Sequence, residues 1–269
     1  MASSGRFVFG LHAFDSNVRV ECFNPEIRDA LDRYIFPPIP RSEALPDSPE
    51  IDFRLEHGVH EIEIVLNHQR VGSAKTVCDA VLATIKALDD AVVQRLKTLR
   101  AVHAGAVLVE GRALVLPGST HAGKSSLVAE LLRRGASCFS DEYALIDGSG
   151  RIHPYPRPLL VRDGRPQQTL VLPEELNSKY AVAPASIGWI FAVEFVSGGE
   201  WHVRQMPQSE AVMLLLRNTP HEAGQSPQLL EMFLKVASGT ICFSGRRGEA
   251  AQAAEKILQL VTASTSSLD

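Results

Sequence analysis

The chain has 269 residues, of which 45% are hydrophobic, so it is long enough for about two domains and is neither disordered nor fibrous. Its net charge of −4 gives no compositional sign of binding to nucleic acid or to an anionic membrane. No apolar run reaches the roughly 20 residues that span a bilayer, no secretory signal is visible, and the four cysteines are scattered singly. We therefore expect a reduced, soluble, cytoplasmic protein.

The first hundred residues have the pattern of a small α/β unit. Phe7–Leu11 and Val18–Phe23 are rich in β-forming residues, and the apolar residues of Pro25–Ile35 follow helical spacing. Five prolines between Pro37 and Pro49 then predict an extended, irregular connection.

A predicted hairpin and a long helix follow. Apolar and charged residues alternate over Ile51–Glu56 and again over Glu61–Ile64, which predicts two half-buried strands joined by a turn at His57–Gly58. Apolar residues recur at steps of three and four over Thr76–Leu99, which predicts an amphipathic helix. Because the sequence texture changes after this helix, we expect an N-terminal unit at residues 1–100 and a second domain at 101–269.

The second domain begins with two nearly continuous apolar runs. Ala106–Val109 and Ala113–Leu116 flank Gly111 and Arg112 and indicate buried strands. A glycine-rich turn, a helix over Lys124–Arg134 and a short strand over Ser137–Ser140 are predicted next. The later predicted elements are a turn at 147–150, strands at Ile187–Glu194 and Trp201–Met206, a helix bounded by Ser226 and Gly239, and a closing helix at Gly248–Ala263 before a polar tail.

The most specific motif is the run Gly118-Ser119-Thr120-His121-Ala122-Gly123-Lys124-Ser125, an unbroken GxxxxGK[ST]. In such a loop, backbone N–H groups surround a β-phosphate, and glycine allows the chain to approach it closely. Lys124 would reach the β- and γ-phosphates, the Ser125 hydroxyl would bind Mg²⁺, and the helix that continues through Ser126 would present its positive N-terminus. The run lies between a predicted strand and a predicted helix, so we expect residues 118–126 to bind ATP with Mg²⁺.

Two acids, Asp141 and Glu142, follow the predicted strand Ser137–Ser140, and Asp141 lies sixteen positions after Ser125. A carboxylate at the end of a buried strand is where a phosphate-loop protein needs a second metal ligand. The pair could divide the work, one acid accepting the proton of an attacking hydroxyl and the other binding the metal. Most strand-end aspartates instead cap a helix or a turn, and by spacing alone the lone His103 is more often structural than chemical.

These features together resemble a known enzyme family. His103 is followed fifteen positions later by Gly118, then by the GxxxxGKS loop and by a strand that ends in Ser140, Asp141 and Glu142. This arrangement resembles the catalytic domain of HPr kinase/phosphorylase, a bacterial enzyme that phosphorylates a serine of a sugar-transport phosphocarrier protein. It is more similar still to the HPr-kinase-related kinases of peptide-modification clusters, including those that phosphorylate lasso-peptide precursors.

The likeness covers residues 101–265, including the run Pro154–Leu159, and the N-terminal hundred residues only in outline. It implies a phosphoenolpyruvate-carboxykinase-like P-loop kinase fold, which is an α/β fold with a mixed, largely antiparallel, strongly bent sheet. It also implies that His103 lies beside the transferred phosphate and that Asp141 is the general base. Glu142 stands where the family has a second aspartate, so the implied metal ligands are Ser125, Glu142 and Asp141.

Two departures from the family pattern bear on the substrate and on the cations. No equivalent of the family's phosphocarrier-binding segment is visible, which argues against the phosphocarrier as substrate. The family's later basic loop has a candidate equivalent at residues 162–165, where Arg162 would neutralise charge on the γ-phosphate. Arg157 and Arg165 are rivals for that role, and all three arginines could simply be solvated.

We therefore expect an ATP-dependent kinase of a hydroxyl group, foremost a serine in a peptide or small protein. One alternative is a kinase of a small-molecule hydroxyl, such as that of free serine or a sugar. Another is an ATP-binding regulatory or scaffold protein without useful transfer, although the intact Lys124, Ser125 and Asp141 argue against it. The expected partners are the acceptor substrate and, because the family forms oligomers, further copies of the chain.

Overall fold

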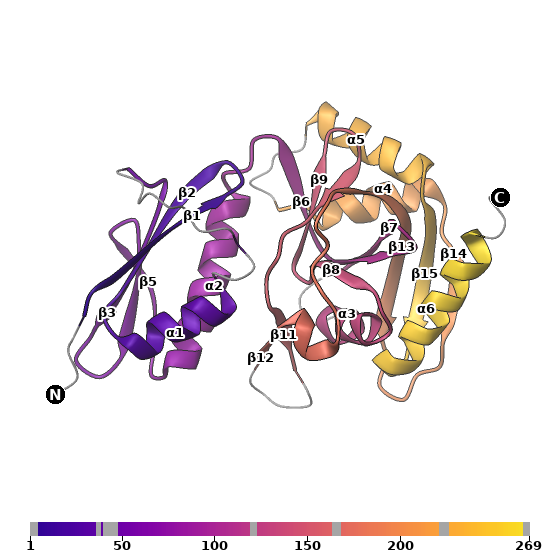
Figure 1. Ribbon diagram of the computed structural model, residues 1–269. Helices are drawn as coiled ribbons and strands as arrows, with labels where there is room; N and C mark the ends of the chain where they lie inside the picture. The colour runs from indigo at the N-terminus through magenta and orange to yellow at the C-terminus, as the bar shows by residue number, and fades with distance from the viewer. Residues whose placement is uncertain are drawn as a thin grey trace. The chain divides into compact units, whose positions relative to one another are not determined.

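The computed structural model describes residues 5–35, 39, 48–118, 123–162, 168–220 and 226–265. The chain divides into two units, residues 1–97 and residues 98–269, which are described separately below (Figure 1). The expected division after residue 100 lies three positions further along the chain. No helix in the described ranges is both long and apolar enough to cross a membrane.

The first unit is a five-stranded sheet accompanied by two helices. Its strands lie in the order β1-β2-β3-β4-β5, and only the β2–β3 pair is parallel. The predicted strands, hairpin and first helix are confirmed, whereas β5 was not predicted, and the proline-rich connection falls largely outside the described residues. The elements are β1 (Phe7–Ala13), β2 (Ser16–Cys22), α1 (Pro25–Tyr34), β3 (Ile51–His57), β4 (Ile62–Leu66), β5 (Gln69–Ala74) and α2 (Val77–Val93).

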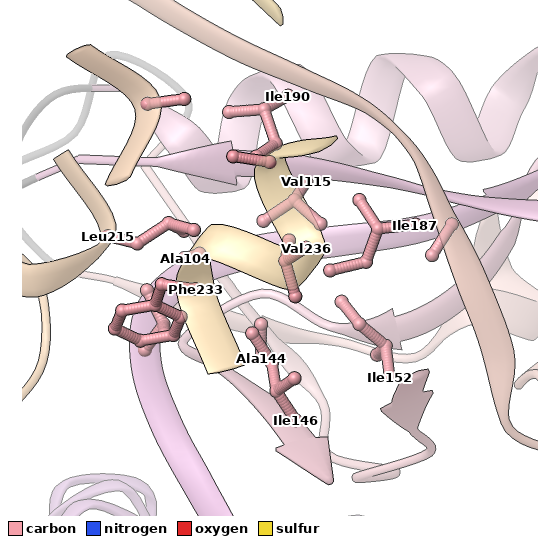
Figure 2. Packing of buried hydrophobic residues seen from close by; sticks show 14 of the residues in the cluster. Ala104, Val115, Ala144, Ile146, Ile152, Ile187, Ile190, Leu215, Phe233 and Val236 are labelled. Atoms are coloured by element: carbon pink, nitrogen blue, oxygen red, sulfur yellow. The ribbon is translucent and has the colours of Figure 1, made fainter. Parts of the chain in front are cut away.

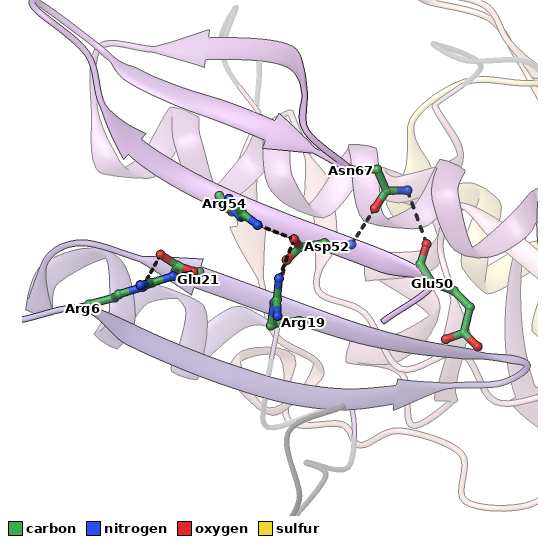
Figure 3. Close-up of polar contacts among 7 residues, drawn as sticks. All are labelled: Arg6, Arg19, Glu21, Glu50, Asp52, Arg54 and Asn67. Atoms are coloured by element: carbon green, nitrogen blue, oxygen red, sulfur yellow. Dashed lines mark hydrogen bonds and ion pairs between the residues drawn. The ribbon is translucent and has the colours of Figure 1, made fainter. Parts of the chain in front are cut away.

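The strands of this sheet alternate between an apolar and a polar face. In β3, Ile51, Phe53 and Leu55 are buried core residues, while Asp52 between them has a polar environment. Arg19 donates to both carboxylate oxygens of Asp52, at 2.8 and 2.7 Å, and Arg54 donates to one of them at 3.0 Å (Figure 3). These pairs compensate the burial of Asp52, and hydrogen bonds from the two arginines keep the pKa of its carboxyl below the usual value although desolvation opposes them.

The predicted end of the second helix, at Leu99, is wrong. Helix α2 ends at Val93, and the last N–H groups shorten their hydrogen bonds to i→i−3, as Leu96 N donates to Val93 O at 3.4 Å. The N–H of Lys97 then donates to the Asp15 side chain at 2.9 Å. Leu99 fits the helical spacing only because it is a buried residue at the start of the next strand.

The second unit contains an eight-stranded mixed sheet in the order β10-β9-β6-β7-β13-β15-β14, with β8 paired to β6. Strand β13 is parallel to β7 and to β15, and the other pairs are antiparallel. The strands of this sheet are β6 (Leu99–Val109), β7 (Arg112–Pro117), β8 (Ser137–Ser140), β9 (Tyr143–Asp147), β10 (Arg151–His153), β13 (Ala185–Phe195), β14 (His202–Gln205) and β15 (Ile241–Arg247).

Among the described residues, the remaining elements of this unit are a small sheet, one 3₁₀ helix and four α-helices. They are β11 (Leu159–Val161) paired with β12 (Thr169–Val171), the 3₁₀ helix η1 (Pro173–Leu176), and the α-helices α3 (Lys124–Arg133), α4 (Gln208–Arg217), α5 (Pro227–Ser238) and α6 (Ala250–Thr265). Expected strands and helices are present within one or two residues at most ends, although β6 begins seven residues earlier than predicted. Strands β9–β12 and β15 and helix α4 were not predicted. The expectation of an α/β fold with mixed sheets is confirmed.

Both faces of the large sheet are covered by helices. On one face, Leu215 of α4 and Phe233 and Val236 of α5 pack with sheet residues such as Val115 (Figure 2). On the other face, residues of α3 and α6 pack with Leu114 and Trp189. Because adjacent strand residues point to opposite faces, Leu114 and Val115 belong to different cores. This layering fixes β7, and with it the start of the GxxxxGKS motif.

Candidate functional site

The GxxxxGKS motif joins β7 to α3. Its flanking residues Gly118 and Gly123 are described, whereas Ser119, Thr120, His121 and Ala122 lie outside the described residues. Gly123 is the N-cap of α3, has the left-handed backbone φ of +74° and has no side chain to cap the helix. The first N–H groups of α3, including those of Ser125 and Ser126, are therefore not capped by this residue and are suited to bind an anion.

Lys124 closes this segment on itself. Its Nζ donates to the carbonyl oxygen of Gly118 at 2.8 Å, and the residue is 9% exposed. Burial lowers the pKa of Lys124, against the opposing attraction of Glu142 and Asp141. The Lys124 side chain thus connects the two ends of the GxxxxGKS motif. Its ammonium group interacts electrostatically with both predicted acids, Asp141 and Glu142.

Arg247, at the end of β15, is a site residue that sequence reasoning missed. Its Nη2 donates to the carbonyl oxygen of Gly123 at 2.8 Å and its Nη1 to that of Gly248 at 2.9 Å. The guanidinium carbon lies 5.2 Å from the centre of the Phe195 ring, and burial lowers the pKa of the group. A Cβ atom on Gly123 would lie 2.5 Å from this Nη2, so a side chain at this position would displace the guanidinium group.

The only sequence signal for this residue was weak. Arg246 and Arg247 precede Gly248 at the start of the predicted closing helix, so two cations were visible just before a predicted helix. What could not be inferred was that β15 lies beside β13, which itself lies beside β7. That pairing brings the end of β15 to the loop after β7, across more than a hundred residues of sequence.

The two predicted acids lie in different environments. Asp141 is 2% exposed, and its Oδ2 accepts a hydrogen bond from the N–H of Leu160 at 3.0 Å. The side chain of Glu142 is 33% exposed. The Ser140 hydroxyl oxygen accepts from the N–H groups of Glu142 and Tyr143 at 3.3 Å each. These two hydrogen bonds hold the turn that contains Asp141 and Glu142.

His103 contacts Glu142 and the start of the loop. Its Nε2 lies 2.9 Å from Glu142 Oε1, and its ring centre lies 5.4 Å from that of Tyr143. Its backbone N–H donates to the carbonyl of Asn218 at 2.7 Å, and its carbonyl accepts from Gly118 N at 3.4 Å. The Nδ1 atom is buried and has no hydrogen-bond partner among the described residues.

A cleft of about 460 Å³ opens at the start of α3, within the usual size range of small-ligand sites. The expected residues Lys124, Ser125, Ser126, Glu142 and Arg162 lie on it. Within the described part of the chain its other lining residues are Gly123, Leu160, Gln168, Phe195, Arg247, Glu249 and Ala250.

The lining of this cleft distinguishes among the candidate arginines. Arg162 is exposed on the cleft, and Arg247 joins it there. Arg157 is 3% exposed, does not line the cleft and lies with its guanidinium carbon 5.6 Å from the Tyr155 ring. Arg165 lies outside the described residues. Asp141 is also not among the described lining residues, so Glu142 is the one of the two predicted acids that lines the cleft, together with Glu249.

Comparison with known proteins adds no assignment to this geometry. A scan against protein-family models finds no match, and a search of curated proteins finds no significant match. Among the described residues, no group of three or more His, Cys, Asp or Glu side chains gathers as a metal site. A magnesium ion carried in with a nucleotide needs fewer protein ligands, because phosphate oxygens and waters complete its coordination.

Proposed function

We propose that the protein is an ATP-dependent phosphotransferase that moves the γ-phosphate of ATP to a hydroxyl group, foremost that of a serine in a peptide or small protein. The observation that carries this proposal is the loop between β7 and α3. Its left-handed Gly123, its Lys124 and the buried Arg247 gather at the mouth of one cleft. Backbone N–H groups and cations in this arrangement suit a polyphosphate.

The cleft residues fit a nucleotide with its metal. Lys124, Arg162 and Arg247 offer positive charge for the phosphates, and the Ser125 hydroxyl and the Glu142 carboxylate would hold Mg²⁺. The metal, when bound, neutralises charge on the phosphates during transfer. Phe195 is 41% exposed and adds an aromatic surface on which a base could stack.

The acceptor chemistry rests on the acids and the histidine. Asp141 is the proposed general base, and the hydrogen bond from Leu160 N to its Oδ2 holds the carboxyl group in place. Glu142 is the proposed metal ligand, and its contact with His103 at 2.9 Å orients both side chains. The mixed sheet, with the loop after β7, supports a phosphoenolpyruvate-carboxykinase-like P-loop kinase domain for the second unit.

Nucleotide-dependent thermal stability tests the binding part of the proposal. ATP with Mg²⁺ at about 100 times its Kd should stabilise the protein by about 2.7 kcal/mol. Lys124→Ala should lose most of the resulting rise in Tm while the unliganded protein stays folded. Lys256→Ala removes an exposed lysine of α6 and should keep the full shift. An unchanged shift in Lys124→Ala would show that the nucleotide binds elsewhere.

Transfer itself is tested with ATP labelled on the γ-phosphate and a serine-containing peptide library. Label that appears in peptides, and that disappears with Lys124→Ala, supports the kinase. Full ATP binding without label in any peptide or in free serine would support a nucleotide-binding scaffold instead.

A further inference from the structure

A second groove, of about 500 Å³, runs along helix α4. Among the described residues, its lining includes four apolar residues, Ala192, Met206, Met213 and Leu214, and two charged residues near the ends of its stretch of α4, Glu210 and Arg217. Met213 is a 49% exposed hydrophobic residue in this lining. Methionine is adaptable and common on surfaces that bind varied apolar side chains. We call this feature the α4 groove.

The α4 groove and the nucleotide cleft lie on opposite faces of the same sheet. Ala192 and Phe195 belong to β13, three residues apart, and they line the groove and the cleft respectively. Residues an odd number of positions apart in a strand point to opposite faces. On the neighbouring strand β15, Ala192 is paired with Ser244 and Phe195 with Arg247. Ser244 lines the groove and Arg247 lines the cleft.

The C-terminal end of helix α4 contacts one of the catalytic candidates. Helix α4 ends at Arg217, and the carbonyl of the next residue, Asn218, accepts a hydrogen bond from His103 N at 2.7 Å. The His103 ring in turn contacts Glu142 on the nucleotide cleft. A chain bound along the groove therefore has its Arg217 end directed to the edge of the sheet where transfer is proposed.

The dimensions and charges of the groove suit an extended peptide. Seven residues separate Glu210 from Arg217, which is about 10 Å along a helix and equals about three residues of extended chain. Glu210 is already paired with Arg204 at 3.1 Å. Arg217 is exposed at the other end, where it can attract a carboxylate. The apolar side chains lie between these two charged ends.

We propose that the α4 groove binds the acceptor: an extended peptide segment with an acidic residue next to the phosphorylated serine and an apolar residue two or three positions further along the same side. This inference rests on the proposed kinase activity. In the transfer, the serine oxygen bonds to the γ-phosphorus as the bond to the β,γ-bridging oxygen breaks. ADP leaves, and the hydroxyl proton passes to Asp141.

Positional scanning of peptides tests this specificity. The probe is a library of ten-residue peptides with one central serine, in which one position at a time is fixed and the others are degenerate, incubated with labelled ATP and Mg²⁺. The unmodified protein should favour Asp or Glu beside the serine and Leu or Met further along. Arg217→Glu should reverse the acidic preference by about tenfold or more, the effect of replacing one attractive pair. Met213→Glu should remove the apolar preference.

Controls separate this inference from the proposed function. Both substituted residues are exposed, so the variants should melt like the parent protein, and Lys256→Glu should keep the parent's selectivity. The KM for peptide should rise in Arg217→Glu and Met213→Glu while the KM for ATP stays constant. Peptide phosphorylation with selectivity unchanged in both variants overturns the groove assignment alone, whereas ATP binding without phosphorylation of any peptide shows that the proposed peptide-kinase activity has failed. Absence of any ATP-dependent rise in Tm shows instead that the proposed function itself has failed.

Discussion

Replacing Gly123 by alanine probes the contact between the phosphate-loop segment and Arg247. Gly123 has a φ of +74°, and placing a residue with a Cβ in this left-handed region costs about 1–2 kcal/mol. Gly111, in the turn between β6 and β7, has a φ of +71° and nothing within 4 Å of an added Cβ. Gly111→Ala is therefore a matched control that carries the backbone cost alone.

Gly123→Ala adds a second cost. The new Cβ would lie 2.5 Å from Arg247 Nη2, the atom that donates to the Gly123 carbonyl. Arg247 is 2% exposed, and a shift of its guanidinium away from the new Cβ breaks this hydrogen bond. Losing a hydrogen bond from a charged group costs about 1.5–3 kcal/mol. We therefore expect Gly123→Ala to lower the free energy of unfolding by about 2.5–5 kcal/mol, against about 1–2 kcal/mol for Gly111→Ala.

Tryptophan fluorescence during guanidinium unfolding of the full chain provides the assay. The two tryptophans of the chain, Trp189 and Trp201, both lie in the second unit, so their signal reports on that unit. In an Arg247→Met background, the cost of Gly123→Ala should fall to that of Gly111→Ala, as a double-mutant cycle requires for two residues in contact. Equal costs for the two glycine variants in the parent protein would refute the packing of Arg247 on Gly123.

Two further predictions concern titratable groups away from the cleft. A thiol-alkylating reagent at about pH 8 should modify the exposed Cys78 well before Cys22 or Cys242. The reason is that burial raises the pKa of the Cys22 and Cys242 thiols to about 11. Peptide mass mapping of the alkylated protein checks this order, and equal rates at the three cysteines would contradict it. Although desolvation opposes them, hydrogen bonds from Ser149 and then from His153 and the backbone hold the pKa of Asp147 well below its usual value. A lowered folded-state pKa stabilises the fold above the unfolded value, near pH 4, and this contribution is lost as pH falls further. Asp147→Asn should therefore flatten the acid decline of the unfolding free energy measured in urea below about pH 4, and an identical decline would contradict this.

Local chemistry made much of the fold predictable. The helix from Pro227 to Ser238 has its cap in the sequence: the Ser226 hydroxyl accepts from Leu229 N at 3.3 Å, and Gly239 ends the helix. The turn between β6 and β7 was visible as Gly111 between two apolar runs. The GxxxxGKS motif was equally local, because neighbouring residues supply a strand, a left-handed glycine and a helix start.

Other features could not be predicted, because they depend on which strands pair or because the sequence has no contrast between apolar and polar faces. Helix α4 was missed because Ala211–Leu216 is a continuous apolar run, without the contrast between faces that identifies an amphipathic helix. Helix α2 was extended too far because a buried strand residue, Leu99, fitted its spacing. Arg247 required knowledge of which strands are neighbours. The difference in burial between Asp141 and Glu142 also depends on tertiary packing, namely on the N–H of Leu160 that Asp141 contacts.

That difference in burial leads to a prediction about how the two acids divide their roles. A serine hydroxyl is a weak nucleophile at neutral pH, and an oriented proton acceptor contributes about 10²–10⁴-fold to its reaction. In Asp141→Asn the amide oxygen can still accept from Leu160 N, so the fold and the binding of ATP with Mg²⁺ should persist. Glu142→Gln keeps the size of a side chain on the cleft but removes a charge from the proposed metal site.

We expect Asp141→Asn to lose about two to four orders of magnitude in single-turnover phosphoryl transfer while isothermal titration shows nearly normal nucleotide affinity. We expect Glu142→Gln to need more Mg²⁺ for half-maximal transfer, because a neutral amide is a poorer ligand for this cation than a carboxylate. Glu255→Gln, on the exposed face of α6, should change neither quantity. Nearly normal transfer by Asp141→Asn would eliminate Asp141 as the base, and loss of its Mg²⁺ binding would reassign it to the metal. If Glu142→Gln then carried the rate loss instead, the acid paired with His103 on the cleft would be the proton acceptor.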